Sequence, residues 1–307
     1  MGLDGPGATA RSDEVGRAFC GGLLGCSSVE GGPTGEQRRV IDTLGQGLYG
    51  MADVASIRPL APDEVGALIT DHKRRHRLVE MMILLEFACH PAHPAMAESV
   101  ERYADVLGVQ ETMLVLGRDA LERRRERLQA DYDRFSGLAG AHAESVENPE
   151  LAARLRSLGD CAPATLGRAF YDFYLRYDLP FPGEPGGPAE AHQIMHHDFA
   201  HVIAGYEPLQ IDELALQGML VAATDGDEHF NGLVAVLGLS EVGMLEFAGA
   251  QSKSNLLMRP GAPEALAHAM HRGRVCGVDL EAVDHLAMVD EPLTSVRREL
   301  KVEARKA

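Results

Sequence analysis

Apolar residues along this chain recur at the spacing of an amphipathic helix, and almost no segment alternates between apolar and polar residues. Alternation with a period of two is typical of a half-buried strand, whereas a period near 3.6 indicates a helix packed on one face. The sequence therefore predicts an almost all-α fold. In the second half, the expected helices are residues 149–158, 165–177, 188–204, 209–223, 240–256, 263–273 and 292–300.

The first half of the chain also has helical periodicity, beginning at about residue 37. Pro62 and the acidic residues that follow it suit the first turn of a helix, where proline and negative charge are favoured. We expect that helix to continue to Cys89, where a proline-bracketed segment breaks it. Further helices are expected at residues 95–107 and 111–135.

Two segments lack this periodicity and set the predicted organisation. Residues 1–35 are rich in glycine and are expected to form a flexible tail. Residues 136–148 are rich in glycine, alanine and serine and are expected to form a domain boundary. The prediction is a helical domain over residues 36–140 and a second one, carrying a metal-binding helix hairpin, over residues 147–307.

Composition limits the classes of function. The formal net charge of −17 argues against nucleic acid as a partner, because phosphate binding needs clustered basic residues. The five cysteines are scattered without zinc-ribbon spacing, which fits a reducing compartment. No apolar run reaches the roughly 18 residues of a membrane span. We expect a cytoplasmic protein, and peripheral contact with a membrane stays open.

Most of the chemical information lies in one short stretch. His197 and His201 are four residues apart and share one helix face, and Glu213 follows twelve residues later. Gly205 favours a helix end and Pro208 a new helix start. The second histidine and the glutamate are then roughly 6 and 7.5 Å from the turn, so in a helix hairpin their side chains meet at similar height.

Two imidazoles and a carboxylate form a ligand set for a divalent ion, with zinc expected first and iron as the alternative. Asp198, about 100° round the helix from His197, is either a fourth ligand or a residue that orients a histidine. The competing interpretation is a pair of histidines that only hydrogen-bond to Glu213. An HD-type phosphohydrolase is a third possibility, although His192 and Asp225 do not fit its usual pattern.

The motif His-Asp-x-x-His-x11-Glu resembles the signature of the coenzyme Q biosynthesis family usually called Coq-four. The similarity extends over residues 147–302, about half of the chain. The stretches that carry it outside the motif are residues 155–158, 165–173, 267–274, 278–280, 291–293 and 296–300. The family usually has glycine before the glutamate, where this chain has Asp212, and tryptophans near its C-terminus, which this chain lacks.

The resemblance implies an all-α domain in which His197, Asp198, His201 and Glu213 bind the metal and carry the catalysis. It implies oxidative decarboxylation and hydroxylation of an aromatic quinone precursor, with or without a prenyl tail. It further implies a groove for an isoprenoid and association with other biosynthetic enzymes at a membrane. The alternative is a non-catalytic isoprenoid-binding or scaffold protein with a structural metal. A homodimer and a larger biosynthetic complex are both open.

Weaker patterns are interpreted structurally. Residues 45–50 fit G-x-G-x-x-G, but without a βαβ context they are expected to allow close helix packing. His72 and His76 are expected on an exposed face, residues 89–93 in a loop and residues 225–228 in a turn. The first helical domain loosely resembles the TerB-like domain of tellurite-resistance-type proteins in its helix spacing, and no site is carried over from that resemblance.

Overall fold

A computed structural model of the chain describes residues 6–51, 53–88, 94–109, 147–186, 191–224, 228–241, 246–247, 250–251 and 256–305. The predicted helix at 111–135 and most of the predicted domain boundary at 136–148 lie outside these residues, as do residues 89–93 and 225–227. Within the described part of the chain, no helix is both long enough and apolar enough to cross a membrane.

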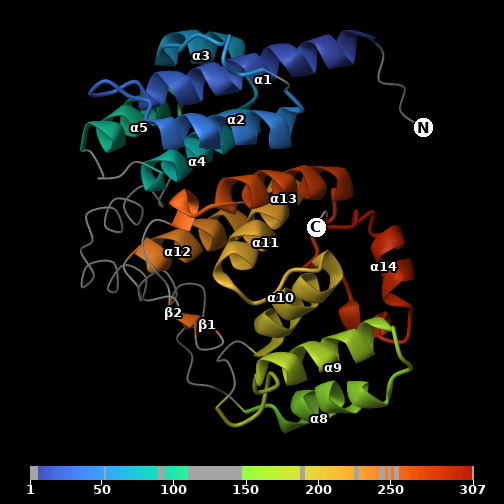
Figure 1. Cartoon of the computed structure of the whole chain (residues 1–307). Helices are drawn as coiled ribbons and strands as arrows, with labels where there is room; N and C mark the ends of the chain where they lie inside the picture. The colour runs from blue at the N-terminus through green and yellow to red at the C-terminus, as the bar shows by residue number, and fades with distance from the viewer. Residues whose placement is uncertain are drawn as a thin grey trace.

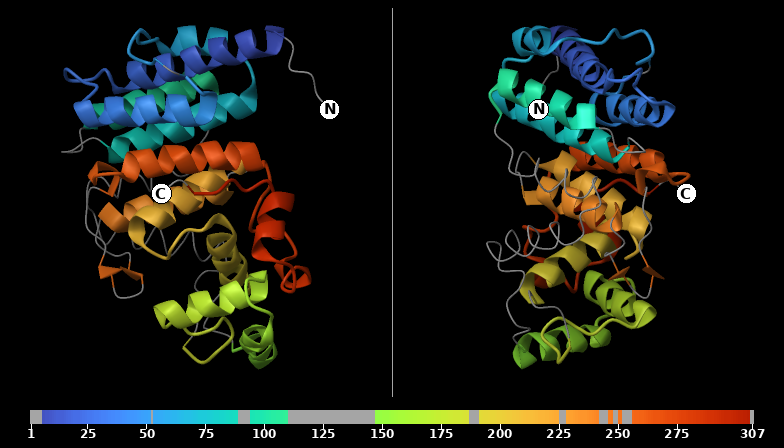
Figure 2. Two further views of the ribbon diagram at one scale, coloured as in Figure 1. Left: turned by 45° about the vertical axis from the view of Figure 1, so that its right-hand side comes forward. Right: turned by 90° about the vertical axis from the view of Figure 1, so that its left-hand side faces the viewer.

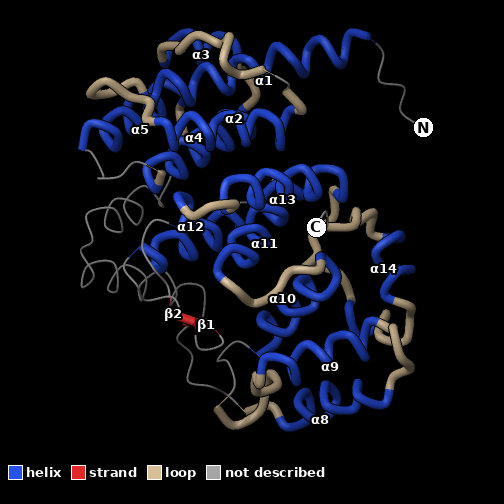
Figure 3. Tube along the Cα trace, viewed as in Figure 1, coloured by secondary structure: helices blue, strands red, loops and turns tan. Residues whose placement is uncertain are grey.

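The described residues are mostly helical, which agrees with the predicted all-α class (Figure 3). The first helices are α1 (Pro6–Ser27), α2 (Gly35–Tyr49), α3 (Pro62–Leu68), α4 (His72–Phe87) and α5 (Pro94–Leu107). The later helices are α8 (Pro149–Ser157), α9 (Leu166–Tyr177), α10 (Ala191–Ala204), α11 (Gln210–Ala223), α12 (Glu228–Glu241), α13 (Ala262–Cys276) and α14 (Leu293–Glu299). Short 3₁₀ turns cover Leu158–Asp160, Leu256–Met258 and His285–Ala287. Among the described residues, the strands are a two-residue antiparallel pair, β1 (Glu246–Phe247) and β2 (Ala250–Gln251).

The predicted flexible tail is wrong for most of its length, because residues 6–27 form α1. Phe19 and Leu23 of this helix are fully buried. Its glycines serve close packing rather than flexibility: a Cβ atom at Gly25 would lie 2.1 Å from the Leu60 carbonyl oxygen. Glycine content alone therefore gave a misleading indication of disorder.

The single helix expected from Pro62 to Cys89 is two helices. Asp71 is the N-cap of α4, and its side chain accepts a hydrogen bond from the backbone N–H of Arg74 at 3.0 Å. Arg75 donates to the carbonyl oxygens of Ile69 at 2.6 Å and Gly66 at 2.7 Å, which satisfies the end of α3. The N-cap hydrogen bond of Asp71 thus starts a new helix at this point, and α3 does not continue into α4.

The helix predicted at residues 240–256 is also misplaced. The helix in this region is α12, which spans Glu228–Glu241, and the strand pair follows it. Phe230, Leu233 and Leu237 lie three and four residues apart and are fully buried, so they form the inner face of α12. The other helices predicted in the second half are confirmed to within a few residues.

The helices are arranged in layers (Figures 1 and 2). Helices α1–α5 form one layer, α11–α13 lie next to it, and α8 and α9 lie on the far side of α10. One apolar core joins the first layer to α11–α13, and a second joins α8–α10 and α14 to the other side of α11 and α13. Because the first core contains residues from both predicted domains, the two parts are packed together. The division into two domains stays a prediction.

Small residues let α13 approach its two neighbours closely. A Cβ at Gly47 of α2 would lie 2.7 Å from the Ala267 carbonyl oxygen, so this glycine serves helix packing, whereas Gly50 ends α2 in the left-handed region with φ of 67°. A Cβ at Gly273 of α13 would lie 2.0 Å from the Met219 carbonyl oxygen of α11. Helix α11, which carries Glu213, is therefore fixed against α13 by backbone contact.

We expect Gly273→Ala to lower the free energy of unfolding by about 1–3 kcal/mol, because the new methyl group would push α11 and α13 apart. This loss should outweigh the gain in helix propensity of about 1 kcal/mol. Urea unfolding of the unaltered protein and of the variant measures the net change in the free energy of unfolding. The matched control is Gly66→Ala in α3, where the nearest atom to a new Cβ is 3.8 Å away. Equal effects of the two substitutions would contradict the close packing.

Candidate metal centre

The hairpin of α10 and α11 is built as the sequence predicts. Gly205 ends α10 in the left-handed region with φ of 76°, and its N–H donates to the His201 carbonyl oxygen at 2.8 Å. The chain then turns, and α11 begins at Gln210, two residues after the expected restart. Glu213 lies in the first turn of α11, opposite the last turn of α10.

Three predicted residues converge at this turn. His201 Nε2 is 3.1 Å from Glu213 Oε1 and 3.2 Å from His197 Nε2, and His197 Nε2 is 3.4 Å from Glu213 Oε2. In the described part of the chain, these residues form the one group of at least three side chains that could hold a metal ion. Ligand atoms bound tetrahedrally to zinc at 2.0–2.1 Å are about 3.3 Å apart, so the spacing fits an ion at the centre.

The far side of each imidazole contacts an acceptor. His197 Nδ1 is 2.7 Å from Glu281 Oε1, and His201 Nδ1 is 3.3 Å from the Tyr206 carbonyl oxygen. A neutral imidazole that donates from Nδ1 presents an unprotonated Nε2 on its other side. Both Nε2 lone pairs then face the Glu213 carboxylate, an arrangement that a cation stabilises.

The group is buried and contains ionisable side chains whose pKa values are shifted. The side chains of His201 and Glu213 are 1% and 4% exposed. Burial alone would raise the pKa of Glu213, but the imidazoles of His201 and His197 lower it to about 2. Burial would lower the pKa of His197, yet hydrogen bonds with Glu213 and Glu281 hold that pKa well above its usual value. Without a metal, His197 thus carries a proton that a bound cation would displace.

Asp198 is not among the three converging side chains. It is buried and accepts a hydrogen bond from the Tyr174 hydroxyl group of α9. Burial, as the largest effect, raises the pKa of Asp198. The structure therefore brings together three of the four predicted ligands, and it directs the fourth carboxyl group to a tyrosine that sequence reasoning did not identify.

Asp212, the residue that departs from the family pattern, has a partner at the end of the described chain. Arg305 Nη1 and Nη2 lie 2.6 and 2.7 Å from its two carboxylate oxygens. The carboxylate also accepts the N–H of Glu207 at 2.9 Å. The Arg305 guanidinium lies 5.1 Å from the Tyr206 ring centroid, so the C-terminal segment holds the turn between α10 and α11. The charge of Asp212 is thereby balanced outside the metal site.

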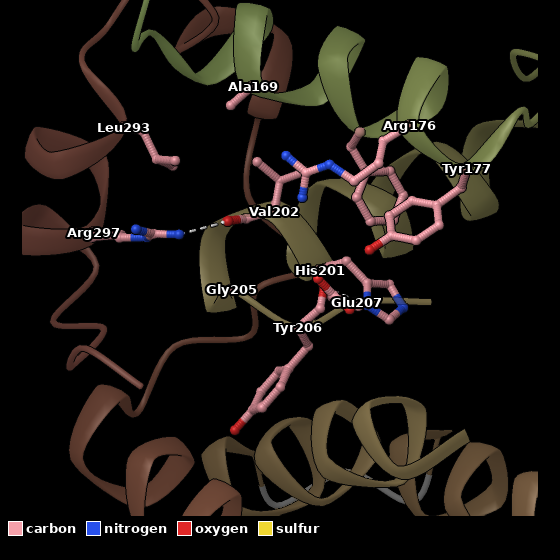
Figure 4. Close-up of a pocket in the computed structure, with 11 residues that line it drawn as sticks. Ala169, Arg176, Tyr177, His201, Val202, Gly205, Tyr206, Glu207, Leu293 and Arg297 are labelled. Atoms are coloured by element: carbon pink, nitrogen blue, oxygen red, sulfur yellow. Dashed lines mark hydrogen bonds between the residues drawn. The ribbon is translucent and has the colours of Figure 1, made fainter. Parts of the chain in front are cut away.

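A pocket of about 230 Å³ opens beside His201 (Figure 4). It has an apolar side formed by α9, α10 and α14 and a polar side from α9 and the turn after α10. Its lining residues are Ala169, Phe173, Arg176, Tyr177, His201, Val202, Gly205, Tyr206, Glu207, Leu293 and Arg297. Arg297 donates to the carbonyl oxygens of Val202 and Ile203 at 2.9 and 2.8 Å, which closes the end of α10.

The other candidates do not form comparable sites. His192 lies exposed on α10 and is not part of the metal-capable group, and Asp225 lies outside the described residues. His72 is exposed on α4 and His76 half-buried; neither belongs to a metal-capable group within the described ranges. No protein-family model matches the chain, and no curated protein matches it significantly.

Asp212 and Arg305 should be coupled in stability. We expect Asp212→Ala to cost about 1 kcal/mol or more, because the Glu207 N–H loses its acceptor. The Arg305 side chain is 40% exposed, so its ion pair with Asp212 contributes little to the free energy of unfolding. In a double-mutant cycle followed by urea unfolding, the coupling energy between Asp212→Ala and Arg305→Ala should be about 0.5–1 kcal/mol. Effects that simply add would show that the pair does not hold the turn.

Proposed function

We propose that the protein binds one divalent ion through His197, His201 and Glu213. The observation that carries this proposal is the convergence of the two Nε2 atoms on each other at 3.2 Å and on the Glu213 carboxylate, one on each of its oxygens, at 3.1 and 3.4 Å. Three protein ligands leave at least one position for water or substrate, which is typical of catalytic rather than structural zinc sites. The same set is the two-histidine, one-carboxylate pattern of non-haem iron enzymes.

We further propose that the site acts on the ring of an aromatic, quinone-type precursor, as the resemblance to the Coq-four family implies. The adjacent pocket supports a ring as the bound group. Phe173, Val202 and Leu293 offer apolar contacts, and Arg176 and Tyr177 offer donors to a ring carboxylate or hydroxyl group. At about 230 Å³ the pocket is below the roughly 300–1,000 Å³ of drug-sized ligand sites, so it suits a ring better than an isoprenoid chain.

When bound, zinc would polarise a ring carboxylate or phenolate, whereas iron would activate dioxygen, the oxidant that oxidative decarboxylation and hydroxylation of the ring require. The residues of the chain have separate tasks. Glu213 holds negative charge at the buried end of the pair of imidazoles, and the Tyr206 carbonyl oxygen orients His201. Phe173, whose ring centroid lies 5.9 Å from that of the His201 ring, packs against this imidazole and lines the pocket.

Metal content tests the binding site. Protein purified without oxygen should hold about one divalent ion per chain by elemental analysis. His201→Ala removes one of three ligands and should weaken the affinity by more than about 100-fold, beyond the effect of an outer-shell change. His192→Ala, an exposed histidine on the same helix, is the control. Equal metal content in both variants would contradict the assignment.

The pocket is tested by blocking it. Ala169→Phe places a ring among the apolar lining residues and should abolish retention of an aromatic ligand while leaving the metal content unchanged. Mass spectrometry of material released from the purified protein measures this ligand. A prenylated or simple aromatic compound in the unaltered protein supports the proposed substrate class. A bare isoprenoid supports a non-catalytic carrier, and retention of the ring by Ala169→Phe would contradict the pocket.

A further inference from the structure

Outside the three ligands, a line of charged and imidazole side chains leads away from His197. It consists of Glu281, His229 and Asp279, none of which the sequence singled out for a role in the site. His229 lies in the first turn of α12, and the two carboxylates lie in the segment that follows α13. Three parts of the chain that are far apart in sequence therefore meet behind one metal-binding imidazole.

We propose that Glu281 is a positioning residue that fixes the orientation and tautomer of His197. This inference rests on the proposed metal site. Glu281 Oε1 is 2.7 Å from His197 Nδ1, which is shorter than any contact within the cluster itself. With the Nδ1 proton directed to Glu281, the Nε2 lone pair points to Glu213 and His201. The negative charge of Glu281 also strengthens the imidazole as a ligand.

Glu281 is itself held in place. Its backbone N–H donates to Asp279 Oδ1 at 2.9 Å, and its second carboxylate oxygen lies 3.9 Å from His229 Nδ1. His229 Nε2 is 3.0 Å from Asp279 Oδ2, so the imidazole lies close to Asp279 on one side and faces Glu281 at the longer distance on the other. The Glu281 side chain is only 21% exposed, which limits the positions it can adopt. The group thus forms a closed ring of contacts around the carboxylate.

The two metal-binding imidazoles are oriented by different means. His201 contacts the backbone carbonyl oxygen of Tyr206, which substitution of a side chain leaves in place. His197 contacts a side-chain carboxylate at its Nδ1. Substitution of Glu281 therefore releases one ligand and leaves the other oriented, so its effect can be separated from loss of the whole site.

The test is zinc affinity of the full chain, measured by competition with a chromophoric chelator. Glu281→Ala should weaken zinc binding about 10- to 100-fold, the usual effect of removing an outer-shell partner. Glu281→Gln keeps an oxygen that can accept the Nδ1 proton and should recover part of the affinity. His229→Gln should weaken binding less than Glu281→Ala. Glu299→Ala, an exposed residue on α14, is the matched control.

Cobalt substitution gives a readout that a loss of general stability would not produce. The visible absorption of bound cobalt should change in Glu281→Ala and stay unchanged in Glu299→Ala. If zinc affinity and the cobalt spectrum of Glu281→Ala equal those of Glu299→Ala, the positioning role is overturned while the metal site stands. If the unaltered protein binds no metal, the proposed metal site is wrong, and the role of Glu281 is wrong with it. Should Glu281→Ala not fold, unchanged affinity in both Glu281→Gln and His229→Gln overturns the role.

Discussion

The arrangement of α10 against α11 depends on one interaction, the pairing of the buried Glu213 carboxylate with two imidazoles. A buried charge is strongly destabilising unless it is paired and hydrogen-bonded. Here two imidazoles from α10 face it, and each imidazole contacts a further acceptor on its other side. The short turn at Gly205 makes this pairing possible, because it brings the end of one helix against the start of the next. The divalent ion that we propose would add positive charge next to the Glu213 carboxylate.

The first layer of helices, α1–α5, packs against α11 and so helps to fix the position of Glu213. Leu214 and Val221 of α11 belong to the core shared with α1–α5, whereas Leu216 and Leu220 of the same helix face the other core. Arg77 of α4 donates to the Thr224 carbonyl oxygen at 2.9 Å, just beyond the end of α11. Helix α11 is thus held on both faces and at its C-terminal end. The position of Glu213 depends on residues that have no part in the chemistry.

The sequence was informative where local geometry decides the outcome. The face shared by His197 and His201 and the height of Glu213 follow from helix periodicity and one glycine, and all three side chains meet as predicted. Contacts between distant segments could not be foreseen: neither the contact of Glu281 with His197 nor the pairing of Arg305 with Asp212 has a local sequence signal. The glycines of α1 misled for the same reason, because Gly21 and Gly25 allow close contact with Leu60, which is distant in sequence.

The most direct measurement is the location of the ion itself. Crystals grown with zinc and measured on both sides of the zinc absorption edge give an anomalous difference map. We expect one strong peak about 2.0–2.2 Å from His197 Nε2, His201 Nε2 and an oxygen of Glu213. The absence of a peak among these three atoms, with zinc bound elsewhere or not at all, would contradict the metal centre and the function built on it.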